Sequence, residues 1–147
     1  MRAAKWLSLW KYRKITFAQV HNYCLSGGNE LAGNCDLLIC SEDVVFGHPA
    51  GRAIGNLPNS QDALWSINTR LRQAKWLSLS RKTMNAEEAL RVGYVNNILP
   101  ADALEEEANE LARIPALMEM DFLTLHKKPM NRFRKMAGLK AATESGV

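Results

Sequence analysis

One stretch of the chain decides how it folds, and it reads Tyr23-Cys24-Leu25-Ser26-Gly27-Gly28-Asn29-Glu30-Leu31-Ala32-Gly33-Asn34-Cys35-Asp36. A strand-like run at residues 15–20 precedes it, and the glycine pair leads into the pattern of a short helix with Glu30 in its first turn. Such a turn can point a backbone N–H group, reinforced by the helix dipole, at a developing negative charge. We therefore expect an oxyanion-binding turn at Gly27 with a candidate acid or base beside it.

The flanking sequence predicts layered α/β structure. Strand patterns occur at residues 15–20, 37–40, 44–46 and 94–99. Helical patterns occur at residues 27–34, 62–79, 86–92, 102–113 and 117–136. Residues 47–60 are rich in glycine, proline and asparagine, and they predict a long loop of the kind that often carries function.

Several residues predict where helices begin and end. Asn85 with Glu88 has the spacing of a capping box, and Gly93 is expected to stop the helix that follows. Asp102 with Glu105 predicts a second capped start. Prolines are expected to end or kink the last two helices, at Pro115 and Pro129.

The composition is that of one soluble globular domain. The chain has 147 residues, of which 47% are hydrophobic and 23% charged, and no apolar run approaches the length of a membrane span. The net charge is +4, and no acidic residue precedes Glu30. The basic start, with Trp6 and Trp10, fits a transit peptide, a nucleic-acid patch or a membrane-surface helix. A solvated lead-in to the first strand is the simpler interpretation.

Three cysteines occur, at Cys24, Cys35 and Cys40. Their number is odd, no CxxC pair is present, and all lie in apolar surroundings. They predict buried free thiols in a reducing compartment. Since no secretory signal precedes them, we expect a cytoplasmic location, with an organelle as the alternative if the basic start is a targeting segment.

Several sequence words, taken in order, resemble the crotonase family, also called the enoyl-CoA hydratase/isomerase superfamily. They lie at residues 18–32, 35–36, 41–43, 46–49, 85–90, 92–96 and 123–132. The resemblance extends from about residue 11 to about residue 139. No single word is decisive, but their order and spacing together are specific.

The resemblance implies a spiral of stacked ββα turns followed by a helical C-terminal region, assembled as trimers or pairs of trimers. It implies acyl-CoA thioester substrates, with coenzyme A as part of the substrate and no separate cofactor. The family's shared chemistry is stabilisation of a thioester enolate by two backbone N–H groups. Gly27 matches one of these donors and Gly28 adjoins it, while Glu30 matches the first of two hydratase glutamates.

The resemblance covers only the C-terminal portion of the family domain, so the second N–H donor is expected in a part that precedes this sequence. The expected organisation is a single truncated domain with a basic lead-in at 1–14, a partial ββα core at 15–100, a C-terminal helical region at 101–139 and a tail at 140–147. Half a spiral exposes an apolar edge, which predicts obligate association or poor solubility.

The chain also departs from the family at the second hydratase glutamate, where it has Ala50. An alanine can neither orient a water molecule nor exchange a proton. The glycine-rich turn expected after residues 57–58 is replaced by Asn59-Ser60-Gln61-Asp62. Altered chemistry, such as thioester hydrolysis or carbon–carbon cleavage, is therefore an alternative to hydration.

Three polar residues around the loop are candidate substrate contacts. His48 could supply a proton or a hydrogen bond, Arg52 could meet a phosphate or an acidic acyl tail, and Asp62 could replace the missing carboxylate. The alternatives are a loop histidine satisfied by the backbone, a solvated cation and an ordinary helix-start carboxylate.

The remaining charged residues favour structural roles. Asp36 is expected to brace the start of a strand, and His126 has no partner at a spacing useful for metal binding, so we expect no metal site. The late helix carries cations that could approach CoA phosphates but are better explained as a solvated face: Lys127, Lys128, Arg132 and Arg134.

The sequence as a whole predicts a homo-oligomeric crotonase-like protein that hydrates a 2-enoyl-CoA reversibly. A non-catalytic assembly or acyl-CoA-binding fragment is the main alternative, and an acyl-CoA hydrolase is another. A basic nucleic-acid binder would rest only on charge and on Trp6, Trp10, Trp65 and Trp76, and we expect no specific nucleic-acid binding.

Overall fold

The computed structural model describes residues 8–49, 61–138 and 141. Its strands are β1 (Phe17–Val20), β2 (Tyr23–Leu25), β3 (Leu37–Ser41), β4 (Val45–Gly47), β5 (Met84–Asn85) and β6 (Asn97–Leu99). Its helices are α2 (Ser8–Lys11), α3 (Gly27–Asn34), α5 (Gln61–Asn68), α6 (Leu71–Ser80), α7 (Ala86–Arg91), α8 (Leu104–Ala116) and α9 (Met120–Met136). Arg52 and Ala50 lie outside the described residues.

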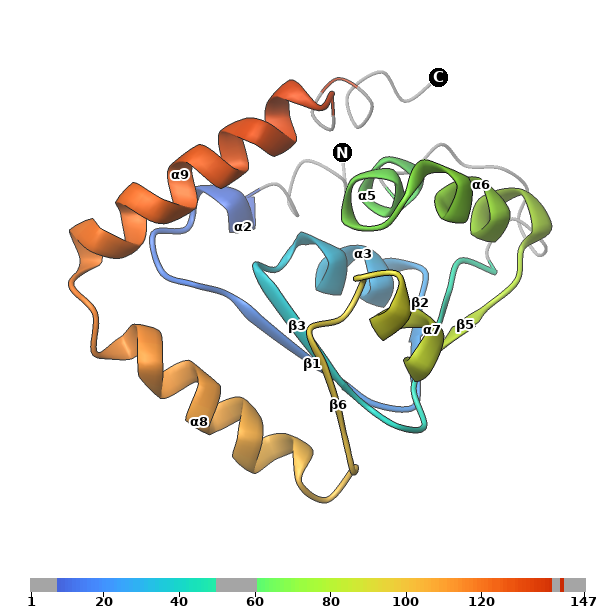
Figure 1. Ribbon diagram of the computed structural model, residues 1–147, viewed down its shortest axis with the longest axis horizontal. Coiled ribbons are helices and arrows are strands. Elements are labelled where there is room, and N and C mark those ends of the chain that lie inside the picture. The colour runs from blue at the N-terminus through green and yellow to red at the C-terminus, as the bar shows by residue number, and fades with distance from the viewer. Residues whose placement is uncertain (1–7, 50–60, 139–140, 142–147) are drawn as a thin grey trace.

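The strands form two small sheets, and successive strands of the chain alternate between them from β1 to β4 (Figure 1). One sheet has the order β1-β3-β6 and is parallel throughout; the other has the order β2-β4-β5, with β2 and β4 parallel and β5 antiparallel. Neighbouring strands along the chain, such as β1 and β2, therefore enter different sheets. This is the stepwise path of a ββα spiral, in which each turn stacks on the next.

The core lies between the sheets and the helices α3, α5, α6 and α7. Phe46, Trp65 and Met84 are fully buried there, as is Cys40 on β3. The ring of Tyr94 packs edge-on against Phe46, with centroids 5.2 Å apart. These contacts fix α3 against the sheets, and α3 carries the candidate site.

Several predicted boundaries are confirmed and others are wrong. Helix α3 has the predicted bounds, and the capping box of α7 forms in full between Asn85 and Glu88. The helix expected at 62–79 is two helices, because Arg70 adopts an extended conformation and the Thr69 hydroxyl bonds back to the Trp65 carbonyl. Helix α8 starts after Ala103 without a side-chain cap, so the predicted cap at Asp102 is wrong.

Both prolines lie inside the helices that they were expected to end or kink. Pro115 lies in the last turn of α8, which ends at Ala116, and Pro129 lies within the 17-residue helix α9, which continues past it to Met136. The strand predicted at 94–99 is shorter, because Tyr94 and Val95 turn into the core before β6 begins. The short strands β2 and β5 were not predicted.

A buried ion pair joins α9 to the start of β3. Lys127 is 6% exposed, and its ammonium group donates to the Asp36 carboxylate at 2.7 Å and to the carbonyls of Lys14 and Leu9 at 2.8 and 3.3 Å. The same carboxylate oxygen accepts two bonds from Thr16, from its N–H and its hydroxyl, each 2.7 Å long. Asp36 therefore braces the strand as predicted, whereas the solvated position predicted for Lys127 is wrong.

Helices α8 and α9 form two arms along one side of the β1-β3-β6 sheet (Figure 1). Both carry large apolar side chains that face solvent: Ile114, Leu117, Phe122, Leu125, Met130, Phe133 and Met136. Within residues 8–49, 61–138 and 141, no helix combines the length and apolar character needed to cross a bilayer.

Candidate active site at the start of α3

The turn between β2 and α3 has an unusual backbone conformation. Ser26 has φ 48° and ψ −118°, a left-handed region that favours glycine, and its side chain makes no cap bond. Holding a residue there costs about 1–3 kcal/mol, and such residues gather at functional sites. The Ser26 N–H group donates to the Gly47 carbonyl at 2.9 Å, which fixes the turn to the end of β4.

The turn presents the Gly27 amide at the start of an eight-residue helix. Among the described residues, no acceptor takes the Gly27 N–H group, as expected for the first amides of a helix. Gly27 and Gly28 are exposed, and a Cβ built on either would meet no atom within 4 Å. Among the described residues, the space that a side chain would fill at both glycines is therefore open, and the helix dipole favours a negatively charged ligand near these first amides.

Glu30 lies in the first turn of the same helix and is half-buried. Its N–H group donates to the Ser26 carbonyl at 2.9 Å, so the carboxylate and the Gly27 amide belong to one rigid turn. The structure thus places the Gly27 amide and the Glu30 carboxylate in the same turn, and their roles as oxyanion donor and acid or base stay predictions.

A buried hydrogen-bond network holds this turn in place. Asn29 is fully buried; its Nδ2 donates to the Gly47 carbonyl at 3.4 Å, and its Oδ1 accepts from the Tyr94 hydroxyl at 2.5 Å. Neither side chain was predicted from the sequence. A polar residue on the inward side of a short helix signals a buried partner, but nothing in the sequence pairs residue 29 with residue 94.

His48 directly follows Gly47, whose carbonyl accepts the hydrogen bond from Ser26. Strands β2 and β4 are parallel with Leu25 opposite Gly47, so both end beside the turn, and His48 is the next residue after β4. Ligands of parallel sheets commonly bind at the carboxyl ends of the strands. Asp62 lies in the first turn of α5 and accepts a hydrogen bond from the Ser78 hydroxyl on α6.

A cavity of about 660 Å³ adjoins the site on the β1 side. Gly28 and Leu31 of α3, Val20 of β1 and Tyr23 of β2 line it. Cys24 also reaches it, but burial raises the pKa of this thiol to about 11, so it is a thiol and not a nucleophilic thiolate at neutral pH. Gly28 of the α3 turn is part of its wall, so the cavity and the turn adjoin at this residue.

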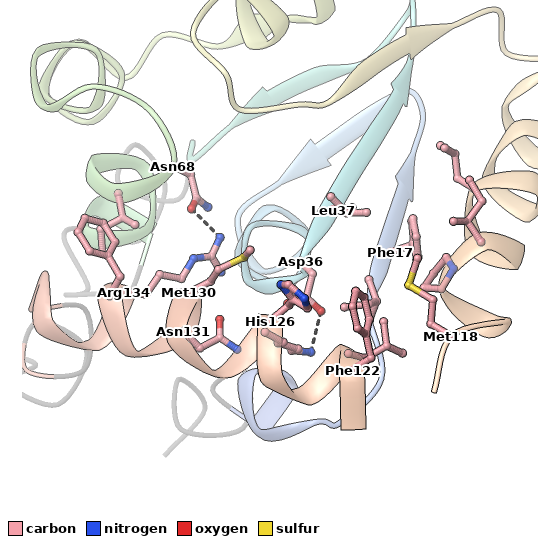
Figure 2. Close-up of a pocket in the computed structure, with 18 residues that line it drawn as sticks. Phe17, Asp36, Leu37, Asn68, Met118, Phe122, His126, Met130, Asn131 and Arg134 are labelled. Atoms are coloured by element: carbon pink, nitrogen blue, oxygen red, sulfur yellow. Dashed lines mark hydrogen bonds and ion pairs between the residues drawn. The ribbon is translucent and has the colours of Figure 1, made fainter. Parts of the chain in front are cut away.

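A second cavity, of about 740 Å³, lies between α8, α9 and the starts of β1 and β3 (Figure 2). Its walls include Phe17, Leu37 and Phe122, and its lining does not include Gly27 or Glu30. The Asp36–Lys127 pair is at its polar side, where Arg134 donates to the Asn68 amide oxygen at 2.9 Å (Figure 2). We therefore do not place the chemistry in this larger cavity.

Arg134 is the second residue of α9 for which the predicted solvated position is wrong. It is half-buried, desolvation lowers the pKa of its guanidinium group, and it bonds to α5 instead of forming part of a solvated face. Lys128 and Arg132 are exposed as predicted. Across the part of the chain that the structure describes, no group of His, Cys, Asp and Glu side chains could hold a metal ion.

Comparisons with known proteins show the family of the chain. Residues 2–144 match the family model described as enoyl-CoA hydratase/isomerase. A probable enoyl-CoA hydratase of Mycobacterium bovis is 37% identical over 132 residues, which are 88% of this chain and 50% of the relative. The mevalonyl-coenzyme A hydratase of Aspergillus fumigatus is 30% identical over 135 residues, 91% of this chain and 50% of that protein.

The fold agrees as well. The crystal structure of a probable enoyl-CoA hydratase from Mycobacterium thermoresistibile superposes with a TM-score of 0.88 at 30% identity, covering 98% of this chain and 60% of that one. The predicted crotonase-like α/β fold is thereby confirmed. The chain spans about half the length of the curated relatives it matches.

Proposed function

Because the chain belongs to the enoyl-CoA hydratase/isomerase family, we propose that its α3 turn forms part of an acyl-CoA thioester site. The Gly27 N–H group would donate to the thioester oxygen, and Glu30 would be the acid/base. Gly28, His48, Arg52 and Asp62 would contact the substrate. The observation that carries this proposal is the Gly27 amide, which meets no acceptor among the described residues and is held beside Glu30 by the strained Ser26 turn.

The proposed reaction is reversible hydration of a 2-enoyl-CoA. The Glu30 carboxylate removes a proton from water as the water oxygen bonds to C3, and the electrons of the double bond move onto the thioester oxygen. The resulting enolate is stabilised by the Gly27 N–H group and then takes a proton at C2 from the protonated Glu30. Loss of one oxyanion donor typically lowers the rate by about 100-fold or more.

Ala50 supports an alternative reaction at the same turn. An alanine at position 50 cannot help to position the attacking water, which would weaken hydration more than it would weaken polarisation of the thioester carbonyl. Thioester hydrolysis, in which water attacks the carbonyl carbon and coenzyme A leaves as the thiol, needs the same oxyanion donor. A non-catalytic acyl-CoA-binding or assembly fragment needs only the binding surface.

The test is hydration of short and medium 2-enoyl-CoAs by the full chain, with free thiol measured in parallel to detect hydrolysis. We expect Glu30→Gln to lower kcat by about 100-fold or more. Glu42→Gln, which removes the same charge from an exposed turn, is the matched control and should leave kcat unchanged. Equal activity of Glu30→Gln and the unsubstituted chain would reject the catalytic role.

Calorimetry with a saturated acyl-CoA separates binding from turnover. Binding without turnover by the unsubstituted chain would support the non-catalytic fragment, and absence of both would reject the acyl-CoA site itself.

We also propose that the chain forms a homo-oligomer, as a trimer or hexamer. The exposed apolar side chains of α8 and α9 support a second copy as the cover of that face, because single domains rarely leave such a patch to water. Light scattering should give a mass of three or six times 16.5 kDa, and a monomer that unfolds cooperatively would contradict this proposal. We place the protein in the cytoplasm, without nucleic-acid partners.

A further inference from the structure

Helix α6 presents a face that the proposed acyl-CoA chemistry does not use. Leu71, Lys75 and Leu79 are spaced by four residues, and Arg72 and Trp76 lie beside them on the same side of the helix. All five are exposed, Leu79 to 80%, Leu71 to 58% and Trp76 to 53%, while Ala74 and Leu77 on the other side are buried in the core. We call these five exposed residues the α6 face.

The charged residues of α6 and its flanks are all basic, and the acid that contacts α6, Asp62 of α5, is bound by the Ser78 hydroxyl. Between residues 63 and 86 there is no aspartate or glutamate, and the charged residues are Arg70, Arg72, Lys75, Arg81 and Lys82. The Lys82 ammonium lies 4.8 Å from the centroid of the Trp76 ring. The α6 face thus combines solvent-exposed leucines and an indole with a cationic surround.

We propose that the α6 face docks on an anionic lipid surface. Apolar side chains of this kind enter the boundary between headgroups and acyl chains, and tryptophan prefers that boundary because its ring is apolar with one polar edge. Cations near an anionic leaflet each contribute about 1 kcal/mol of attraction. The positive charge of α6 and its flanks complements anionic headgroups, and its exposed leucines can enter the acyl-chain layer beneath those headgroups.

A nucleic acid fits this face less well. Leu71 and Leu79 would lie against phosphates, where apolar side chains contribute no binding free energy. Trp65 is fully buried and cannot stack on a base. A second copy of the chain is also a weaker fit, because the basic surround of α6 would face itself across a two-fold interface. The larger apolar surface, on α8 and α9, lies on the opposite side of the molecule (Figure 1).

The test is co-sedimentation of the full chain with vesicles of phosphatidylcholine, with and without about one third phosphatidylglycerol. We expect binding to the anionic vesicles that weakens with added salt, and little binding to phosphatidylcholine alone. Leu79→Gln and Lys75→Glu should each lower the affinity about tenfold, since each removes on the order of 1–2 kcal/mol of apolar or electrostatic attraction.

Two matched variants outside α6 serve as controls. Leu90→Gln alters a leucine on α7 that is 43% exposed, and Lys128→Glu reverses an exposed cation on α9, so both should leave the affinity unchanged. Equal losses from the α6 variants and the control variants would overturn the proposal, as would absence of binding to anionic vesicles. Light scattering of Leu79→Gln should give an unchanged mass, and dissociation of the assembly would instead assign the face to a second copy.

A single-stranded RNA is the competing macromolecule. Binding of RNA that is tighter than binding of anionic vesicles, and that is lost in Lys75→Glu but kept in Leu79→Gln, would also overturn the lipid proposal.

Discussion

At the scale of single residues, the candidate site depends on how Ser26 holds the turn. The sequence predicted an oxyanion turn because two glycines precede a helix pattern, and it predicted the bounds of that helix. It could not reveal that the strained position belongs to Ser26 and not to a glycine, because φ is set by the hydrogen bond to Gly47, a residue on another strand. The hydrogen bond between Asn29 and Tyr94 was not predicted either, because it joins residues that are far apart in the sequence.

Ser26→Gly should stabilise the protein. Glycine adopts a positive φ without steric cost, and the Ser26 side chain makes no cap bond that would be lost. We expect the free energy of unfolding in urea to rise by about 1 kcal/mol, after allowance for the greater chain entropy of glycine. Ser66→Gly, inside α5, should instead lower it by about 0.5–1 kcal/mol, and equal effects of the two variants would contradict the strain at position 26.

At the scale of elements, α9 is attached to the sheet through a satisfied ammonium group. All three donors of Lys127 have acceptors, on α2, on the lead-in to β1 and at the start of β3. The sequence predicted the helix and the bracing role of Asp36, but not their pairing, which joins positions separated by most of the chain. Helical periodicity likewise gave α5 and α6 as one helix, since the extended conformation of Arg70 that separates them does not interrupt the apolar pattern.

Lys127→Met should destabilise the protein strongly. The substitution leaves the Asp36 carboxylate buried without its counter-ion, and loss of one partner of a buried pair costs about 3–5 kcal/mol. Urea denaturation followed by circular dichroism measures the change. Lys128→Met, one position along and exposed, should stay within about 0.5 kcal/mol, and a similar small effect at Lys127 would show that the pair is not formed.

At the scale of the whole molecule, the core keeps its thiols protonated. Burial raises the pKa of Cys24 to about 11 and that of Cys40 to about 12, from an ordinary value of 9.0, and the pKa of Cys35 is also raised. The sequence predicted buried free thiols, and the structure confirms them as unpaired, with Cys24 and Cys40 buried and Cys35 half-buried.

These shifts predict a loss of stability at alkaline pH. The unfolded chain releases the thiol protons above about pH 9 while the folded chain retains them, so the free energy of unfolding falls as the pH rises toward the folded pKa values. Urea denaturation at about pH 8 and about pH 10 measures this fall. In Cys24→Ala with Cys40→Ala the fall should be shallower, and an unchanged pH dependence would contradict the role of the thiols.

The carbonyl oxygen of Gly47 receives both the Ser26 N–H group and the Asn29 amide, so one atom of β4 aims the Gly27 amide. A Cβ at position 47 would lie 3.0 Å from the Thr83 methyl group and 3.3 Å from Leu25. Thr83, just before β5, therefore sets how much room that backbone has. A larger side chain at position 47 therefore requires a smaller one at position 83, and the reverse. A bulkier side chain at position 83 would change the direction of the Gly27 N–H group without itself contacting a ligand.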